Sequence, residues 1–330
     1  MKPFDYSPAA EVEEAVATVA AAPRAAFLGG GTNLVDHMRI GVAEPDLLVD
    51  VSRLPLDRVE DLPDGGLRIG AAVRNSDLAA DERVRTRYPA LSRALLSGAS
   101  GQLRNLATTG GNLLQRTRCV YFQDVTTPCN KRQPGSGCSA LEGYQRYHAI
   151  FGASEHCVAV HPSDMAAGML ALDAVVRVHG PAGQRSIPLE ELHRLPGDAP
   201  ERDTVLEHGE LITAVDLPAT PFAARSTYRK VRDRASFAFA LVSVAAALDL
   251  RDDGTIADLR IACGGVAHSP WRAHRAEQVL RGEHVGDDAF RDAAEAELTQ
   301  AEPLRGNEFK VPMLRNTMLR VLRDLTEGRR

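Results

Sequence analysis

Cysteines and glycine-rich turns are the residues of this chain whose types and spacing point to chemistry. Three cysteines lie within residues 103–138, shortly after a turn of small and polar residues. This turn comprises Thr109, Gly110, Gly111 and Asn112. Glycine lets backbone amides approach an anion, and thiolates are ligands for zinc and for iron–sulfur clusters. The segment therefore suggests two redox cofactors in one chain.

A second glycine-rich loop lies nearer the start of the chain. The apolar residues Ala25 to Leu28 predict a short strand that leads into this loop, where no Cβ keeps backbone amides from a ligand. The loop and its flanks comprise Phe27, Leu28, Gly29, Gly30, Gly31, Thr32, Asn33 and Leu34. This composition suits a phosphate or pyrophosphate, and two such loops could clamp one diphosphate from both sides. Neither loop matches the P-loop or the dinucleotide fingerprint, so a plain tight turn is the alternative for each.

The spacing of the cysteines argues against the usual structural zinc site. Nine residues separate Cys119 from Cys129, eight separate Cys129 from Cys138, and eighteen separate Cys138 from Cys157, so none of these pairs is a CxxC knuckle. The loop between them is rich in proline and glycine and needs something to hold it. Four thiolates suit an iron–sulfur cluster, while zinc, disulfides and inert buried cysteines stay open. Cys263, far from the others, is predicted to be a buried apolar residue.

Asp164 and Lys230 each have two interpretations. Asp164 either caps the helix that follows His161 or accepts hydrogen bonds from the hydroxyls of a ligand. Lys230 lies in a basic run and either belongs to a solvated face or meets a carboxylate or cofactor. His148, His156 and His161 are candidate metal ligands, although lone histidines beside loops are more often core or surface residues. The sequence alone leaves these roles open.

Composition and charge limit the classes of function. With 330 residues, of which 44% are hydrophobic and 25% charged, the chain is typical of a globular protein with two or three domains. A formal charge of −5 argues against nucleic-acid binding. Five cysteines are an odd number and a poor pattern for a secreted disulfide framework. No apolar run follows Lys2 and no segment approaches the length of a membrane span, so we expect neither a secretory signal nor a transmembrane helix.

Hydrophobic patterns predict a βαβ unit that is followed by further strands and helices. Ser7 and Pro8 are predicted to start the first helix, because serine caps free amides and proline suits the first turn. Strands are expected at 25–28, 47–51, 66–71 and 211–217, a hairpin at 174–183, and helices within 75–97 and after residue 162.

A proline-rich linker at Pro218–Pro221 predicts a domain boundary near residue 222. The first domain, residues 1–221, contains both glycine-rich loops and the cysteine-rich loop 119–157, and the second domain spans residues 222–330. In the second domain we expect strands at 226–232 and 256–262, a strand or helix at 237–250, and helices at 273–280, 287–298 and 311–325. The pattern predicts an α+β protein that ends in an antiparallel sheet with a helical layer.

Four motifs in this order resemble the FAD-binding subunit of the xanthine dehydrogenase and molybdenum hydroxylase family. They are LGGGTNL, ATTGGNLL, HPSDM and YRKVRDRASFAFALVSVAAAL, and the resemblance covers essentially the full chain. It implies an FAD domain of two α/β subdomains, like that of vanillyl-alcohol oxidase (PCMH type), and a C-terminal domain of the CO dehydrogenase flavoprotein type. The segment RCVYFQDVTTPCNKRQPGSGCSAL looks like the branch of the bacterial periplasmic aldehyde oxidoreductase flavoprotein subunit, which adds a [4Fe–4S] cluster.

The resemblance also implies roles for particular residues. Leu28 to Leu34 and Thr109 to Asn112 would hold the pyrophosphate of FAD, with Phe27 among the cofactor-binding residues. Asp164 would bind ribityl or ribose hydroxyls, and Ile212 and Lys230 would approach the flavin. The cluster ligands implied by the resemblance are Cys119, Cys129, Cys138 and Cys157.

A heterotrimer is the assembly that the resemblance implies. A large molybdenum-cofactor subunit would oxidise an aldehyde, and a small subunit with two [2Fe–2S] clusters would relay electrons to FAD and then to an external acceptor. No residue of this chain need act as a general acid or base. The resemblance favours a periplasmic location by co-export with a partner, and the cytoplasm is the alternative. Other functions left open are a stand-alone FAD-dependent oxidoreductase, a zinc-stabilised binding module and a metal-free nucleotide-binding regulator.

Overall fold

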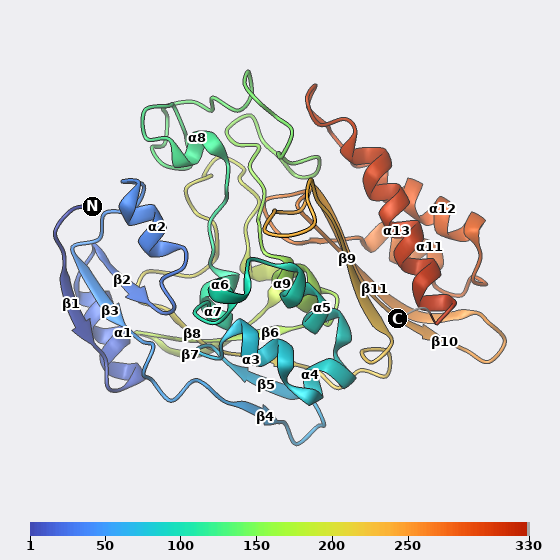
Figure 1. Cartoon of the computed structure of the whole chain (residues 1–330), viewed down its shortest axis with the longest axis horizontal. Helices are drawn as coiled ribbons and strands as arrows, with labels where there is room; N and C mark the ends of the chain where they lie inside the picture. Colours follow the sequence, from blue (N-terminus) through green and yellow to red (C-terminus); the bar gives the residue numbers. More distant parts are fainter. Residues whose placement is uncertain (329–330) are drawn as a thin grey trace.

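The computed structural model describes residues 1–328, which contain three sheets (Figure 1). The first is a small sheet of three parallel strands in the order β1-β3-β2. Its strands and the neighbouring helices are β1 (Asp5–Pro8), α1 (Val12–Ala21), β2 (Ala25–Leu28), α2 (Leu34–Arg39) and β3 (Leu47–Asp50). Because β2 and β3 are parallel neighbours joined through α2, they form the expected βαβ unit. The first glycine-rich loop follows β2 directly.

The start of the chain corrects the prediction that Ser7 and Pro8 open a helix. Both residues belong to strand β1, which pairs with β3, and α1 begins only at Val12. Proline is tolerated in an edge strand, whose outer side needs no amide donor. The pairing continues past the strand, where Ala9 N donates to Asp50 O over 3.0 Å. Residues 5–8 form a strand and not a helix start because they pair with β3, which lies about 40 residues further along the chain.

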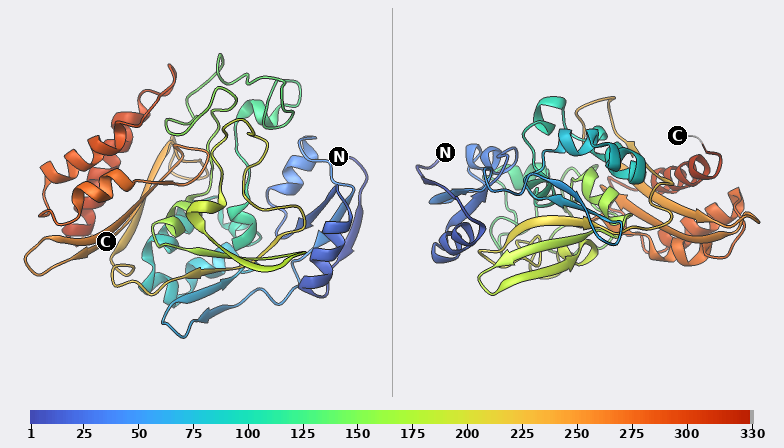
Figure 2. Two further views of the ribbon diagram at one scale, coloured as in Figure 1. Left: turned by 180° about the vertical axis from the view of Figure 1, so that it is seen from behind. Right: turned by 90° about the horizontal axis from the view of Figure 1, so that it is seen from below.

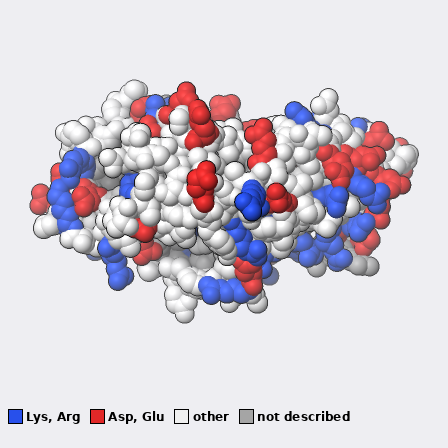
Figure 3. All heavy atoms as spheres, turned by 90° about the horizontal axis from the view of Figure 1, so that it is seen from above, with Lys and Arg blue, Asp and Glu red and all other residues white. Residues whose placement is uncertain are grey.

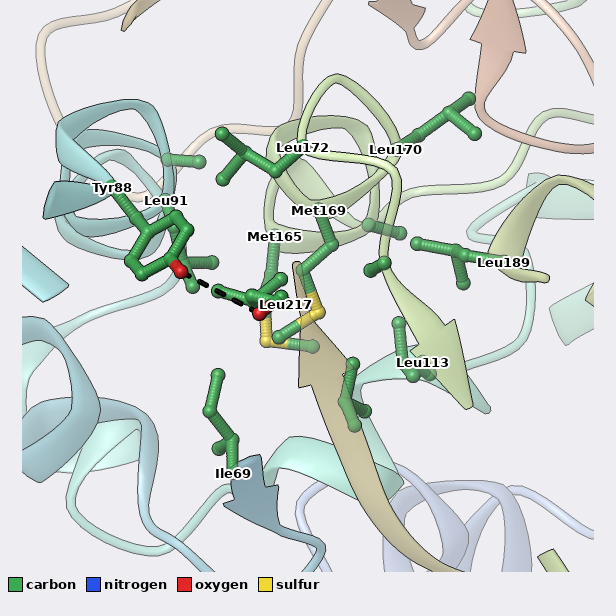
Figure 4. Close-up of a cluster of buried hydrophobic side chains, with 14 of the residues drawn as sticks. Ile69, Tyr88, Leu91, Leu113, Met165, Met169, Leu170, Leu172, Leu189 and Leu217 are labelled. Carbon is green, nitrogen blue, oxygen red and sulfur yellow. Dashed lines mark hydrogen bonds between the residues drawn. The ribbon is translucent and has the colours of Figure 1, made fainter. Parts of the chain in front are cut away.

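The second sheet has five antiparallel strands in the order β4-β5-β8-β6-β7. These strands are β4 (Val59–Asp61), β5 (Leu67–Gly70), β6 (Val175–Gly180), β7 (Gly183–Pro188) and β8 (Leu211–Leu217). The helices that share its apolar core are α3 (Asn75–Ala80), α4 (Glu82–Arg87), α5 (Pro89–Ser97) and α9 (Asp164–Leu170). Figure 4 shows this core, in which Met165 and Met169 of α9 lie between Leu91 and Ile69, and the Tyr88 hydroxyl donates to Leu217 O. The core fixes α9 above the sheet.

The third sheet has four antiparallel strands in the order β12-β11-β10-β9. These strands are β9 (Ser226–Val231), β10 (Val242–Leu250), β11 (Ile256–Gly264) and β12 (Trp271–Arg272), and the helices beside them are α11 (His274–Leu280), α12 (Asp287–Leu298) and α13 (Lys310–Thr326). Alternate residues of β10 face different cores: Ala245 packs with α5 and α9, and Val244 and Ala246 pack with α11 to α13. The expected α+β fold with a final antiparallel sheet and helical layer is confirmed, and 237–250 contains a strand (Figure 2).

The cysteine-rich segment lies outside all three sheets. Residues 114–163 connect α7 to α9 and contain a single helical turn, α8 (Val120–Gln123), at the top of Figure 1. The remaining short helices are α6 (Gly101–Arg104), α7 (Thr109–Leu113) and α10 (Leu189–Leu192). The expectation of a loop with little secondary structure is confirmed. Such a segment depends on side-chain contacts for its conformation.

Charged side chains on the face that carries this segment are unevenly distributed. Figure 3 shows separate acidic and basic side chains over the middle of this face, and a denser mixture of both at the end formed by the last part of the chain. Within residues 1–328, no helix combines the length and the apolar character needed to cross a membrane.

Candidate functional site

A cavity of about 590 Å³ lies where the two glycine-rich loops, the start of α9 and strand β9 meet. This volume is within the usual range for cofactor sites. Six of the residues that the sequence analysis selected for cofactor binding line it: Thr32, Asn33, Gly111, Asn112, Asp164 and Lys230. Three candidate metal ligands, Cys119, His148 and His161, line it as well. Its wall also contains Asn75, whose buried Oδ1 accepts no hydrogen bond from residues 1–328. The cavity therefore joins parts of the chain that are far apart in sequence.

The two glycine-rich loops touch at a point where no side chain fits. A Cβ on Gly30 would lie 1.9 Å from Leu106 O, and a Cβ on Gly29 would lie 3.1 Å from Thr108 Oγ1. Gly31 has φ +72°, a conformation that favours glycine. The first loop is thus packed directly on the backbone that leads into α7.

The amides of the first loop are the ones available to an anion. Those of Gly29, Gly30 and Gly31 donate no hydrogen bond to any residue in the described part of the chain. By contrast, Thr109 N donates to Val73 O and Gly110 N to Ala71 O, each over 2.9 Å. A clamp by the backbone amides of both loops is therefore not what the structure provides, because these two donors are already used. The second loop contributes the wall of the cavity.

Asp164 and Lys230 form a buried ion pair at the cavity wall. Lys230 Nζ lies 2.6 Å from Asp164 Oδ2, and the exposed fractions of the two side chains are 3% and 7%. The Tyr228 hydroxyl donates to Asp164 Oδ1, and burial, then the Asp164 charge, raises the Tyr228 pKa well above its usual value. Ser163, and not Asp164, caps α9, since its Oγ accepts from Ala166 N. Asp164 is therefore not the cap of α9, and Lys230 is paired with a buried carboxylate and is not part of a solvated face.

Other residues selected from the sequence lie next to the loops that form the cavity but do not line it. Ile212 on β8 is 2% exposed and lies under α7, where its Cβ would be 3.7 Å from a Cβ on Gly110. The Thr109 hydroxyl donates inward to Val73 O over 3.0 Å. Phe27 and Leu28 belong to β2, and Leu34 is the first residue of α2. These side chains position the loops and do not line the cavity.

The four cysteines of the loop influence one another electrostatically but do not form a ready-made metal site. All are free thiols, and Cys129 and Cys138 are paired across an isolated antiparallel bridge. The Cys119 pKa is raised to about 11, mainly by burial, and both Cys129 and Cys138 add to the shift. Burial likewise raises the Cys157 pKa to about 12, with further contributions from Cys138 and Cys119. Within residues 1–328, no three His, Cys, Asp or Glu side chains are grouped closely enough to hold a metal ion.

Two histidines contact the outermost cysteines of this set. His148 Nε2 lies 3.2 Å from Cys119 Sγ, and His268 Nε2 lies 3.3 Å from Cys157 Sγ. Hydrogen bonds to sulfur are the usual neighbours of iron–sulfur ligands, so the donor set fits such a cluster. Sequence reasoning selected His148 as a ligand and missed His268, which follows β11 and has no local signal of its role. His156 lies instead within 3.7 Å of Asp198.

His161 and His193 hold the end of α7. Their Nε2 atoms donate to the same carbonyl, Leu113 O, over 3.2 and 2.8 Å. Both are buried, and burial lowers the pKa of each below its usual value, so both rings are neutral. His193, which the sequence analysis did not select, thereby connects the segment after α10 to the cavity.

Comparisons with known proteins agree with this arrangement. The family described as "FAD binding domain in molybdopterin dehydrogenase" matches residues 2–220, and "CO dehydrogenase flavoprotein C-terminal domain" matches residues 226–325. The aldehyde oxidoreductase FAD-binding subunit PaoB of Escherichia coli K12 is 52% identical over 325 residues, which are 98% of each chain. The glyceraldehyde dehydrogenase medium chain of Sulfolobus acidocaldarius is 26% identical over 91% of this chain and 89% of its own length.

Solved structures share the architecture over nearly the full chain. Carbon monoxide dehydrogenase from Hydrogenophaga pseudoflava is 27% identical, with a TM-score of 0.75 over 98% of this chain and 96% of that chain. Quinoline 2-oxidoreductase from Pseudomonas putida 86 is 24% identical, with a TM-score of 0.76 over 99% of each chain, and supports the fold alone.

The contact between the glycine-rich loops predicts the effect of a single methyl group. Gly30→Ala should lower the free energy of unfolding by about 1–3 kcal/mol, the usual cost of overpacking, and should reduce the flavin bound per chain, because the loops are pushed apart. The control is Gly101→Ala, where the added Cβ has no neighbour within 4 Å. Thermal unfolding and flavin absorbance measure both effects. Equal flavin content in the two variants would contradict this role of Gly30.

Buried neutral histidines predict a loss of stability in mild acid. The pKa of His37 is lowered to about 4, mainly by burial, and those of His161 and His193 are also lowered. Below about pH 6.5 the unfolded chain takes up protons that the folded chain does not, so each histidine costs up to about 1.4 kcal/mol per pH unit.

The melting temperature should therefore fall between pH 7.5 and 5.5. His193→Gln, whose amide can still donate to Leu113 O, should show a smaller fall over the same range. An identical pH dependence in the variant and the wild type would show that His193 does not contribute.

Proposed function

Because this chain belongs to the FAD-binding subunits of the xanthine dehydrogenase and molybdenum hydroxylase family, we propose that it carries electrons through FAD and a [4Fe–4S] cluster to an external acceptor. It is an oxidoreductase subunit of a molybdenum hydroxylase-type aldehyde oxidoreductase complex. The observation that carries the proposal is one cavity whose wall contains Thr32 and Asn33, the buried carboxylate of Asp164 and the Cys119 thiol. Thr32 directly follows three glycines whose amides donate no hydrogen bond within residues 1–328.

FAD is proposed to bind with its pyrophosphate at Gly29 to Asn33 and its hydroxyl-bearing chain near Asp164. Free amides stabilise phosphate oxygens, and a carboxylate accepts hydrogen bonds from hydroxyl groups. Lys230 neutralises Asp164, since an unpaired buried carboxylate would cost several kcal/mol. Gly110, Gly111 and the residues behind them shape the opposite wall. Bound FAD would supply the hydride and electron chemistry, which belongs to the cofactor.

A [4Fe–4S] cluster is proposed at Cys119, Cys129, Cys138 and Cys157. Burial disfavours isolated thiolates here, whereas coordination to iron would stabilise them. The loop also has few hydrogen bonds of regular secondary structure, so a cluster would supply the cross-links that it otherwise lacks. The contacts of His148 and His268 with sulfur support the same assignment.

Two domains are proposed, residues 1–221 and 222–330. The matches to two separate families support the division, as does the Pro218–Pro221 stretch between β8 and β9. The second domain packs on α5 and α9 through the sheet that contains Lys230. Lys230 from one domain and Asp164 from the other then join across the proposed boundary.

The proposed partners are a large molybdenum-cofactor subunit and a small subunit with two [2Fe–2S] clusters. The names of the relatives support an assembly, since they are called a FAD-binding subunit and a medium chain. In this assembly the chain would orient FAD and the cluster, and its residues would need no proton-transfer role. Co-export with a partner to the periplasm is proposed for its location.

A stand-alone flavin oxidoreductase is the second candidate, because the cavity is lined entirely by residues of this one chain. Such an enzyme would oxidise a substrate without partner subunits. Activity of the isolated chain toward aldehydes would support it, and activity only in a complex would support the main proposal.

Removing one thiol should affect the binding of iron without affecting the binding of FAD. Cys129→Ser should lose most of its iron and keep FAD, because Cys129 is not among the residues that line the cavity. Cys263→Ala is the matched control, since Cys263 is buried in β11 and faces the core beside α11 to α13. Iron and flavin analysis measures both. Retention of all iron in Cys129→Ser would contradict the assignment of the cluster, and loss of both cofactors would show that the cysteine loop also builds the flavin site.

A further inference from the structure

A connecting segment of the first domain touches the binding regions of both proposed cofactors. Residues 193–205, between α10 and β8, have no regular helix or strand and were not selected from the sequence. At one end His193 donates to Leu113 O at the end of α7. In the middle, Gly197 O accepts from Ser154 Oγ over 2.9 Å. We call this stretch the connecting segment.

Asp203 is the charged centre of the connecting segment. Its Oδ2 lies 2.6 Å from Arg116 Nε, and its Oδ1 lies 2.5 Å from Lys131 Nζ. Burial opposes ionisation, but Arg116 and Lys131 outweigh it and lower the Asp203 pKa to about 2. One carboxylate therefore balances two cations at neutral pH.

Arg116 connects Asp203 to the glycine-rich loop. Its backbone N donates to Asn33 Oδ1 over 2.9 Å, and Asn33 lines the cavity. Its guanidinium also lies over the Phe122 ring, 4.7 Å from the centroid. Arg116 is thus held by two side-chain contacts and one backbone contact, so a movement of Asp203 would be transmitted through Arg116 to the glycine-rich loop.

Lys131 connects Asp203 to the cysteine loop. It follows Cys129 by two residues, and only 2% of its side chain is exposed. Its ammonium also donates to Pro200 O over 2.7 Å, and its charge lowers the pKa of Cys157. A buried cation thus lies close enough to Cys157 to act on its thiol, and Asp203 is the acidic group bonded to this cation.

We propose that Asp203 is a positioning residue that joins the glycine-rich loop to the cysteine loop and sets the charge beside the proposed cluster. The proposal rests on the proposed function, and it names a residue that fixes the positions of the glycine-rich loop and the cysteine loop relative to each other. The potential of an iron–sulfur cluster responds to nearby charge, because a cation favours the reduced, more negative state. Asp203 lowers the net positive charge beside the thiols, and Lys131 raises it.

The test is a redox titration of the cluster in the purified complex. Asp203→Asn keeps the shape of the side chain and removes its charge, so the midpoint potential should shift to a more positive value. Lys131→Gln removes the opposing charge, so the potential should shift to a more negative value. The variant with both changes should lie closer to the wild type than either single variant.

Glu201→Gln is the matched control, because Glu201 is exposed and lies two residues from Asp203 in the same segment. Its potential should equal that of the wild type. Shifts of the same sign in the two single variants, or an unchanged potential with full iron and flavin, would overturn the inference. If Asp203→Asn loses its iron, the midpoint potential of Lys131→Gln provides the test. A shift to a more negative value supports the inference, and an unchanged value or a shift to a more positive value overturns it.

Cofactor content separates this inference from the proposed function. Iron and flavin in the wild type report on the proposed function, and their absence would overturn both claims. Normal content with unshifted potentials would overturn the role of Asp203 alone.

Discussion

The arrangement of the site depends on one steric constraint, the contact of Gly30 with the backbone at Leu106. Because a Cβ there would lie 1.9 Å from a carbonyl oxygen, the two glycine-rich loops approach more closely than any other residue would permit. This approach leaves the amides of Gly29, Gly30 and Gly31 without partners in residues 1–328, next to Thr32 and Asn33, which line the cavity. The βαβ unit and the five-stranded sheet, which share no strands, are joined at this point.

A different kind of interaction holds the cysteine-rich segment. It has one helical turn and no sheet, so ion pairs and hydrogen bonds fix it to neighbours on both sides. Lys131 forms an ion pair with Asp203 in the segment between α10 and β8, and Lys310 of α13 donates to His148 O over 2.8 Å. These buried polar contacts are expensive to break, since each would leave an unpaired group without water. The segment is thus tied to both parts of the chain before any metal is considered.

Local patterns predicted the parts of the fold that depend on local physics. The strands 25–28 and 211–217 are found where apolar runs placed them. Ser7 and Pro8 were misassigned, because the partner of β1 is distant in sequence. The pairing of Lys230 with Asp164, and the roles of His193 and Asp203, required the packing of distant segments. Side-chain types indicated chemistry, and only tertiary contacts indicated which groups were already satisfied.

The central claim, that one chain holds a flavin and an iron–sulfur cluster side by side, is tested most directly by cofactor stoichiometry. The measurement is the absorption spectrum of anaerobically purified wild-type protein, with iron and acid-labile sulfide determined on the same sample. The account predicts one flavin with about four irons and four sulfides per chain. Zinc without flavin, or flavin without iron, would contradict it.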